Sequence, residues 1–204
     1  MSFLGAHRLM CSYYYVKIEP MSKRNLYPLD YVESTYCIDF KKLYEQGYRG
    51  VIFDVDNTLV PHNAPADDRA KALFKELHEI GFEALLLSNN KEPRVKQFME
   101  DVKYCTYIFK AGKPKASGYV RAMAQMSTDV NNTIFVGDQI LTDIWGANRA
   151  GIRSVMVKPV KKWHEEIQII LKRFLEAVIL LGYRIYKLYG KNINKVPLKQ
   201  AKEN

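Results

Sequence analysis

The feature that most constrains the fold is a regular alternation of short apolar runs with amphipathic stretches between residues 50 and 159. This alternation is typical of βαβ units, in which helical crossovers join parallel strands. The sequence therefore predicts an α/β fold with an open parallel sheet between two layers of helices. Strands are expected at residues 50–55, 83–88, 107–111, 133–137 and 153–157, and helices at 66–80, 93–101, 115–126 and 143–150.

Charge divides the chain into three parts. Residues 50–157 carry 13 basic and 13 acidic side chains, whereas residues 158–204 carry 11 basic and 4 acidic ones, a net charge of +7. With 204 residues, the chain is long enough for one catalytic module and short for two independent domains. We expect an N-terminal extension packed on the core (residues 1–49), a central domain (50–159) and a basic helical tail (160–204).

The tail has an apolar stripe at helical spacing with basic residues beside it, which is typical of an amphipathic helix. Its longest uncharged stretch, residues 177–183, is too short to span a bilayer. Two interpretations remain open: binding to an anionic membrane surface, or packing on the catalytic domain or a second copy of the chain. The stripe comprises Ile167, Ile170, Leu171, Phe174, Leu175, Val178, Ile185 and Tyr189, and the basic residues are Lys172, Arg173, Arg184 and Lys187.

The cysteines predict a reducing compartment. Cys11, Cys37 and Cys105 are odd in number and widely spaced, which favours neither a disulfide framework nor a zinc site. The first 20 residues lack the features of a secretory signal. We expect a cytoplasmic protein, with peripheral contact at the inner face of the membrane if the tail binds lipid.

Polar residues cluster where the predicted strands end. In an open parallel sheet the ligand site lies beyond the carboxyl ends of the strands, so these residues are the candidates for chemistry. They are Asp54, Asp56 and Thr58 at the end of the first predicted strand, Ser88 and Asn89 at the end of the second, Lys113 after the third, and Asp138 with Asp143 at and after the end of the fourth.

The spacing of the acids predicts a metal site. Asp54 and Asp56 are two residues apart, so on a regular strand they point to the same face and converge on one small volume. Their repulsion is tolerable beside a hard divalent cation, and a set of oxygens completed by Asp138 suits Mg²⁺. Lys113 adds a fixed positive charge and Ser88 a hydroxyl donor.

Together these side chains supply what phosphoryl transfer requires: a nucleophile, cations for the equatorial oxygens and a proton donor. Asp54 is the predicted nucleophile, forming an aspartyl phosphate. Asp56 is the predicted acid that protonates the leaving group and then the base that activates water.

The ordered motifs DxDxT, a strand ending in Ser, Lys-Pro and GDxxxxD resemble those of the haloacid dehalogenase (HAD) superfamily. The strings FDVDNTLV, LLLSNN, KAGKPKASG and VGDQILTDIWGANRAG resemble the YqeG-type class IIIA phosphatases, relatives of the mitochondrial phosphatidylglycerophosphate phosphatases. The resemblance implies a Rossmann-like, HAD-like fold that acts with Mg²⁺. It covers about residues 50 to 159.

The resemblance also implies a role for each matching residue. Asp54 is the nucleophile and Asp56 the acid and base. Magnesium is held by Asp54, the backbone carbonyl of Asp56, and Asp138, while Asp143 orders metal-bound water or Lys113. The substrate phosphate is contacted by Thr58, Ser88, Asn89 and Lys113.

The segments between the motifs are too short for a lid, so we expect a capless, open site that accepts a phosphate displayed on something large. The leading prediction is a phosphatidylglycerophosphate phosphatase of phospholipid synthesis. The alternative is a binding protein with this fold, recruited to RNA or ribosomes by its basic tail, with weak phosphatase activity on nucleotides or proteins. An acid at position 56 favours a phosphatase over a dehalogenase.

Overall fold

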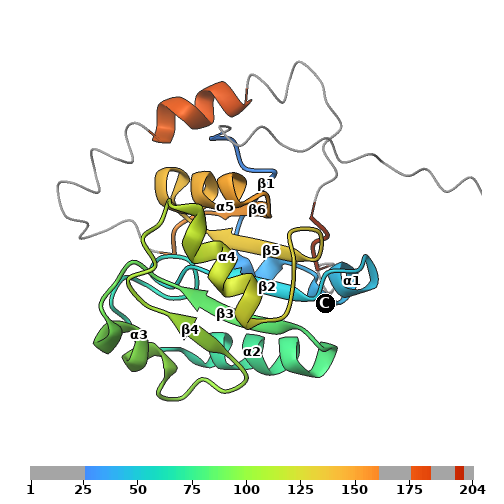
Figure 1. Ribbon diagram of the computed structural model, residues 1–204, viewed down its shortest axis with the longest axis vertical. Helices are drawn as coiled ribbons and strands as arrows, with labels where there is room; N and C mark the ends of the chain where they lie inside the picture. The colour runs from blue at the N-terminus through green and yellow to red at the C-terminus, as the bar shows by residue number, and fades with distance from the viewer. Residues whose placement is uncertain (1–25, 161–175, 185–195, 200–204) are drawn as a thin grey trace, which may run out of the picture.

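A six-stranded, wholly parallel sheet forms the centre of the computed structural model (Figure 1). The structure describes residues 26–160, 176–184 and 196–199. Strands follow the order β1-β6-β5-β2-β3-β4 across the sheet. Their bounds are Asp30–Val32 for β1, Gly50–Phe53 for β2, Glu83–Leu87 for β3, Thr106–Ile108 for β4, Thr133–Gly137 for β5 and Arg153–Val157 for β6.

Helices cover both faces of this sheet, which confirms the predicted three-layer α/β architecture. The helices α2 and α3 lie on one face, and α4 and α5 on the other (Figure 1). The bounds are Phe40–Glu45 for α1, Asp68–Ile80 for α2, Glu92–Met99 for α3, Ala116–Gln125 for α4 and Trp145–Ala150 for α5. A 3-10 helix, η1, spans Thr35–Cys37, and a π-helix, η2, spans Ile140–Ile144.

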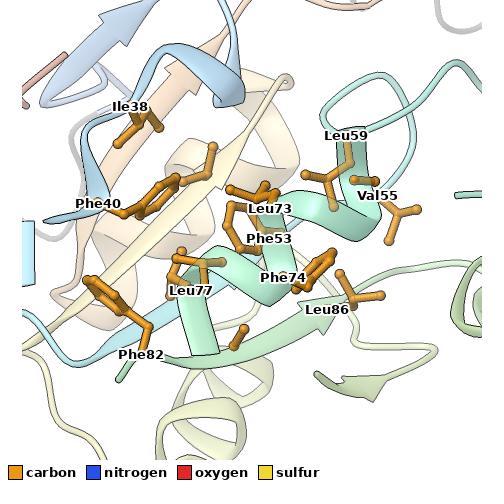
Figure 2. Close-up of a cluster of buried hydrophobic side chains, with 14 of the residues drawn as sticks. Ile38, Phe40, Phe53, Val55, Leu59, Leu73, Phe74, Leu77, Phe82 and Leu86 are labelled. Atoms are coloured by element: carbon orange, nitrogen blue, oxygen red, sulfur yellow. The ribbon is translucent and has the colours of Figure 1, made fainter. Parts of the chain in front are cut away.

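The main hydrophobic core fills the layer between the sheet and α2 (Figure 2). Alternate residues of each strand enter it, so Phe53 packs here while its neighbour Ile52 faces the core under α4 and α5. Phe74 of α2 lies edge-on to Phe53, with ring centroids 5.7 Å apart. Burial of apolar residues on both faces explains why β2 reads as a continuous apolar run.

Local sequence signals set the ends of α2. The Asp67 carboxylate accepts the backbone N–H of Ala70 at 2.9 Å, as an N-cap does. Gly81 ends the helix with a φ of 103°, in the left-handed region that suits glycine. These two residues set where α2 begins and ends.

Segments from both ends of the chain complete the sheet edge. β1 pairs in parallel with β6, and the Asp30 carboxylate accepts the N–H of Val196 at 2.6 Å and lies 2.9 Å from Arg153. Ile38 and Leu198 form an isolated antiparallel bridge.

Residues 176–184 of the predicted tail are helical, and their inner face packs on η2 and β6. In this segment Ile179 and Leu180 contact the buried cluster that contains Ile140 and Met156. Val178 and Leu181 point outward, with exposed fractions of 56% and 59%. The other predicted stripe residues, Ile167, Ile170, Leu171, Phe174, Leu175, Ile185 and Tyr189, lie outside the described residues. Within the described ranges, no helix has the length and apolar character needed to cross a bilayer.

Candidate active site

The candidate site lies at the point where the strand order reverses. β2 is flanked by β3, which follows it in the chain, and by β5, which comes after two further crossovers. In open parallel sheets the crossovers diverge at such a point, and ligands bind beyond the carboxyl ends of the strands. Asp54 follows β2 directly and Asp138 follows β5 directly.

A buried lysine joins two of the acids. Lys113 Nζ lies 2.6 Å from Asp54 Oδ1 and 2.7 Å from Asp143 Oδ1, and its side chain is only 3% exposed. Burial alone would lower the pKa of Lys113, but the carboxylates of Asp143 and Asp54 outweigh it and hold the pKa above its usual value. Lys113 is therefore a fixed cation within the site.

Three buried carboxylates lie close enough together to hold a metal ion. One oxygen from each of Asp54, Asp138 and Asp143 lies within 4.8 Å of the others. Lys113 brings one positive charge to these three carboxyl groups. Burial raises the pKa of Asp54 to about 7, with the Lys113 charge opposing the rise and the Asp143 charge adding to it. Hard oxygen ligands with surplus negative charge fit a divalent ion such as Mg²⁺.

The hydroxyl of Thr58 bridges two members of this group. Thr58 Oγ1 lies 3.3 Å from Asp54 Oδ2 and 3.5 Å from Asp138 Oδ1. Because the side chain is buried, it can fix the orientation of the Asp54 carboxylate within the site.

The GDxxxxD segment is built to hold Asp143. Asp143 Oδ2 accepts the backbone N–H of Gln139 at 3.1 Å, and the Tyr119 hydroxyl donates to the Asp143 carbonyl at 3.0 Å. A Cβ atom at Gly137 would lie 2.7 Å from Asp143 Oδ2, so only glycine leaves room for the carboxylate. Gly146 leaves room for the Tyr119 side chain, because a Cβ there would overlap the Tyr119 hydroxyl.

The Asp56 carboxylate is not one of the three grouped carboxylates, although it lies close enough to Asp54 for its charge to raise the pKa of Asp54. The Asp56 carboxylate turns to other partners: the backbone N–H of Asn63 at 2.8 Å, Asn90 Nδ2 at 2.6 Å and an Arg94 nitrogen at 2.8 Å. The physical reason is that β2 ends at Phe53, so strand alternation no longer governs the following residues. Asp56 instead begins a turn, and a bridge between Asp56 and Val60 closes this turn.

Ser88 and Asn89 lie beside the group. The Ser88 Oγ accepts the backbone N–H of Asn90 at 3.1 Å, and its hydroxyl hydrogen can still be donated. Asn89 uses both ends of its side-chain amide on Lys113, accepting the Lys113 N–H at 2.8 Å and donating to the Lys113 carbonyl at 3.0 Å. Asn89 thus holds the backbone of the lysine loop.

Sequence reasoning missed several residues that hold the site, among them Asn90, Arg94 and Glu176. The first two bind Asp56, and Glu176 Oε1 accepts the N–H of Ile140 at 2.8 Å at the start of η2. Asn90 could have been found from the sequence, because it follows Ser88 at a strand end. No sequence pattern points to Arg94 or Glu176, since a single charged residue in an amphipathic helix usually faces solvent.

Comparison with known proteins agrees with this arrangement. A family model for HAD-hydrolase-like proteins matches residues 110–169. The probable phosphatase YqeG of Bacillus subtilis is 38% identical over 141 residues, which cover 69% of this chain and 81% of that protein.

Two further matches are more distant. The chloroplastic phosphatidylglycerophosphate phosphatase 1 of Chlamydomonas reinhardtii is 30% identical over 68% of this chain, and the match spans 55% of that protein. A crystal structure of a protein from Listeria monocytogenes serotype 4b has a TM-score of 0.47 at 18% identity, covering 58% of this chain and 86% of that one. The extent of the match to the Bacillus protein shows that this chain belongs to the YqeG-type phosphatases of the haloacid dehalogenase superfamily.

Proposed function

We propose that this phosphatase hydrolyses a phosphomonoester through an aspartyl phosphate formed on Asp54, with Mg²⁺ held by the Asp54, Asp138 and Asp143 group. The observation that carries the proposal is the position of Lys113 between Asp54 and Asp143, next to Asp138, at the strand-order reversal. The metal ion, when bound, neutralises phosphoryl oxygens as negative charge develops on them. The Asp56 backbone carbonyl is a further proposed ligand.

In the first step, an Asp54 oxygen bonds to phosphorus while the bond from phosphorus to the substrate oxygen breaks. The electron pair of that bond goes to the leaving oxygen, which takes a proton from Asp56. Lys113 keeps Asp54 oriented and offsets charge on the phosphoryl group. Thr58 and Ser88 are proposed donors to phosphoryl oxygens.

In the second step, a water oxygen bonds to phosphorus and the bond to the Asp54 oxygen breaks. Asp56 takes a proton from that water, which restores both carboxyl groups and releases inorganic phosphate. The same side chain therefore serves as acid and then as base.

We further propose that the substrate is a lipid phosphate of the phosphatidylglycerophosphate type. The crossover from β2 to β3 contains α2 and the loop of residues 54–67, and the crossover from β3 to β4 contains α3, so neither carries a cap domain. An open site suits a phosphate on a large carrier. The name of the Chlamydomonas relative supports a lipid headgroup.

A peripheral membrane contact at the cytoplasmic face would bring the site to such a substrate. The exposed Val178 and Leu181 lie on the outer face of residues 176–184, with Arg184 beside them. The net charge of +7 over residues 158–204 would favour an anionic surface. Recruitment to RNA is less favoured, because the acids and the lysine that a phosphatase needs are all in place.

A phosphate-release screen with Mg²⁺ tests the substrate directly. It would compare phosphatidylglycerophosphate in vesicles with glycerol 3-phosphate, a nucleoside 5′-monophosphate and a phosphopeptide, using Asp54→Asn as the blank. We expect the highest kcat/KM for the lipid. Faster turnover of the nucleotide or the peptide than of the lipid would contradict the lipid assignment. It would not contradict the phosphatase reaction.

A further inference from the structure

Asp56 is held by a ring of donors that comes from three parts of the chain. Its Oδ1 accepts the Asn63 N–H and two Arg94 nitrogens, at 2.8 Å for the terminal nitrogen and 3.3 Å for Nε, and His62 Nδ1 lies 3.7 Å from the same oxygen. Its Oδ2 accepts only Asn90 Nδ2, at 2.6 Å, among the described residues. The two carboxylate oxygens are therefore held unequally, with most of the restraint on Oδ1.

The Arg94 side chain is largely buried and does not lie on the surface. Its side chain is 11% exposed, and the nitrogen that binds Asp56 also donates to the Ala64 carbonyl at 2.9 Å. The guanidinium thus ties α3 to the loop that follows Asp56. The fork geometry of an arginine permits these simultaneous contacts, whereas a lysine offers a single ammonium nitrogen.

The second guanidinium nitrogen gives an independent indication of function. Arg94 Nη1 is buried and has no hydrogen-bond partner among the described residues. A buried donor without a partner costs folding free energy, so packing alone does not explain an arginine at this position.

From this geometry we infer that Arg94 is a positioning residue that anchors Oδ1 of Asp56, so that Oδ2 is the oxygen that carries the proton in both steps. The inference deepens the proposed function and depends on it. Protonation of Oδ2 leaves every donor to Oδ1 in place. The carboxyl group then keeps its orientation while it gives a proton to the leaving oxygen and takes one from water.

The test is the variant Arg94→Met, which keeps much of the side-chain volume and removes the anchor. Two substrates separate the steps, because p-nitrophenyl phosphate needs little acid help and an alkyl phosphate needs much. We expect kcat for glycerol 3-phosphate to fall on the order of 100-fold, as expected for a misplaced catalytic group. With p-nitrophenyl phosphate, acid-quench labelling should show that phospho-Asp54 accumulates, because its hydrolysis still needs a well-placed base.

Three controls sharpen the result. Arg69→Met removes another arginine that pairs with an aspartate, Asp67 at 3.2 Å, on the exposed surface, and it should match the wild type. Guanidinium ion added to Arg94→Ala should restore part of the lost turnover. Arg94→Lys should lie between wild type and Arg94→Met, which keeps the test usable if the methionine variant folds poorly.

Asp56→Asn, measured in parallel, separates this inference from the proposed function. If Asp56→Asn accumulates phospho-Asp54 and a folded Arg94 variant does not, Arg94 has no positioning role and the reaction scheme stands. If neither variant accumulates it, the acid and base role of Asp56 is itself wrong. Equal losses on both substrates, without a labelled intermediate, would also overturn the inference.

Discussion

Glu176 accepts the backbone N–H of Ile140 at 2.8 Å, which joins the C-terminal helical segment to the first residue of η2. η2 also contains Asp143, the acid that holds Lys113. The tail is therefore part of the support of the site, and deleting residues 161–204 would remove that support together with any membrane contact.

Glu176→Ala should lower both stability and turnover. It leaves the N–H of Ile140, a fully buried residue, without this acceptor, at a cost of about 1–3 kcal/mol. Each kcal/mol corresponds to a fall in Tm of about 2–4 °C for a chain of this size. Glu176→Gln, which keeps an acceptor oxygen, is the matched control. Thermal melting and phosphate release would measure both effects, and identical melting of the two variants would argue against the cap.

Replacing outward-facing residues tests the membrane contact without disturbing the packed face. Val178→Ser together with Leu181→Ser should reduce turnover of a lipid phosphate in anionic vesicles by roughly tenfold, because less apolar surface enters the interface. Turnover of glycerol 3-phosphate should be unchanged. Val130→Ser, at a residue that is 42% exposed on another part of the surface, is the control. Unchanged vesicle binding and lipid turnover would make the membrane contact untenable.

Asp54→Asn should abolish turnover and leave the fold intact. The amide matches the carboxylate in shape but neither attacks phosphorus nor brings charge to the metal ion. Thermal melting should show a cooperative transition no lower than that of the metal-free wild type, because the variant no longer buries an ionisable acid. Residual activity within about tenfold of wild type would remove Asp54 as nucleophile.

Removal of metal should eliminate activity, and Mg²⁺ should restore it. Ca²⁺ should support turnover poorly, because its longer and more variable bonds misplace the nucleophile relative to phosphorus. Mg²⁺ should also raise the Tm by preferential binding to the folded state, and Asp138→Ala should weaken that shift. Full wild-type activity in EDTA, or a Tm that does not change when Mg²⁺ is added, would exclude the proposed metal site.

The sequence predicted the interior of the sheet better than its edge. The runs that became β2, β3, β5 and β6 are mostly apolar, and they are buried except at Glu83 and Arg153, the first residues of β3 and β6. β1 was not predicted, since it has only three residues and begins with Asp30. Burial of that aspartate depends on Arg153 and on the N–H of Val196, two distant partners that no local pattern reveals.

The candidate site, too, could be predicted only in part. Residues at strand ends can be placed by topology, so the sequence alone is enough to single out Asp54, Lys113 and Asp138. The direction of the Asp56 carboxylate could not be read from a spacing of two, because it depends on a turn outside the strand. Its partners Asn90 and Arg94 come from a different crossover, and only the folded chain brings them to Asp56.

The hydrogen bond from Val196 to Asp30 spans 166 residues, and it has a consequence for synthesis of the chain. On the ribosome β1 emerges early, but β6, on which β1 pairs, and the donor to Asp30 emerge near the end. The edge of the sheet must therefore stay incomplete while the catalytic loops are translated. Nascent chains arrested before residue 196 should be cut by protease near β1 more readily than released protein.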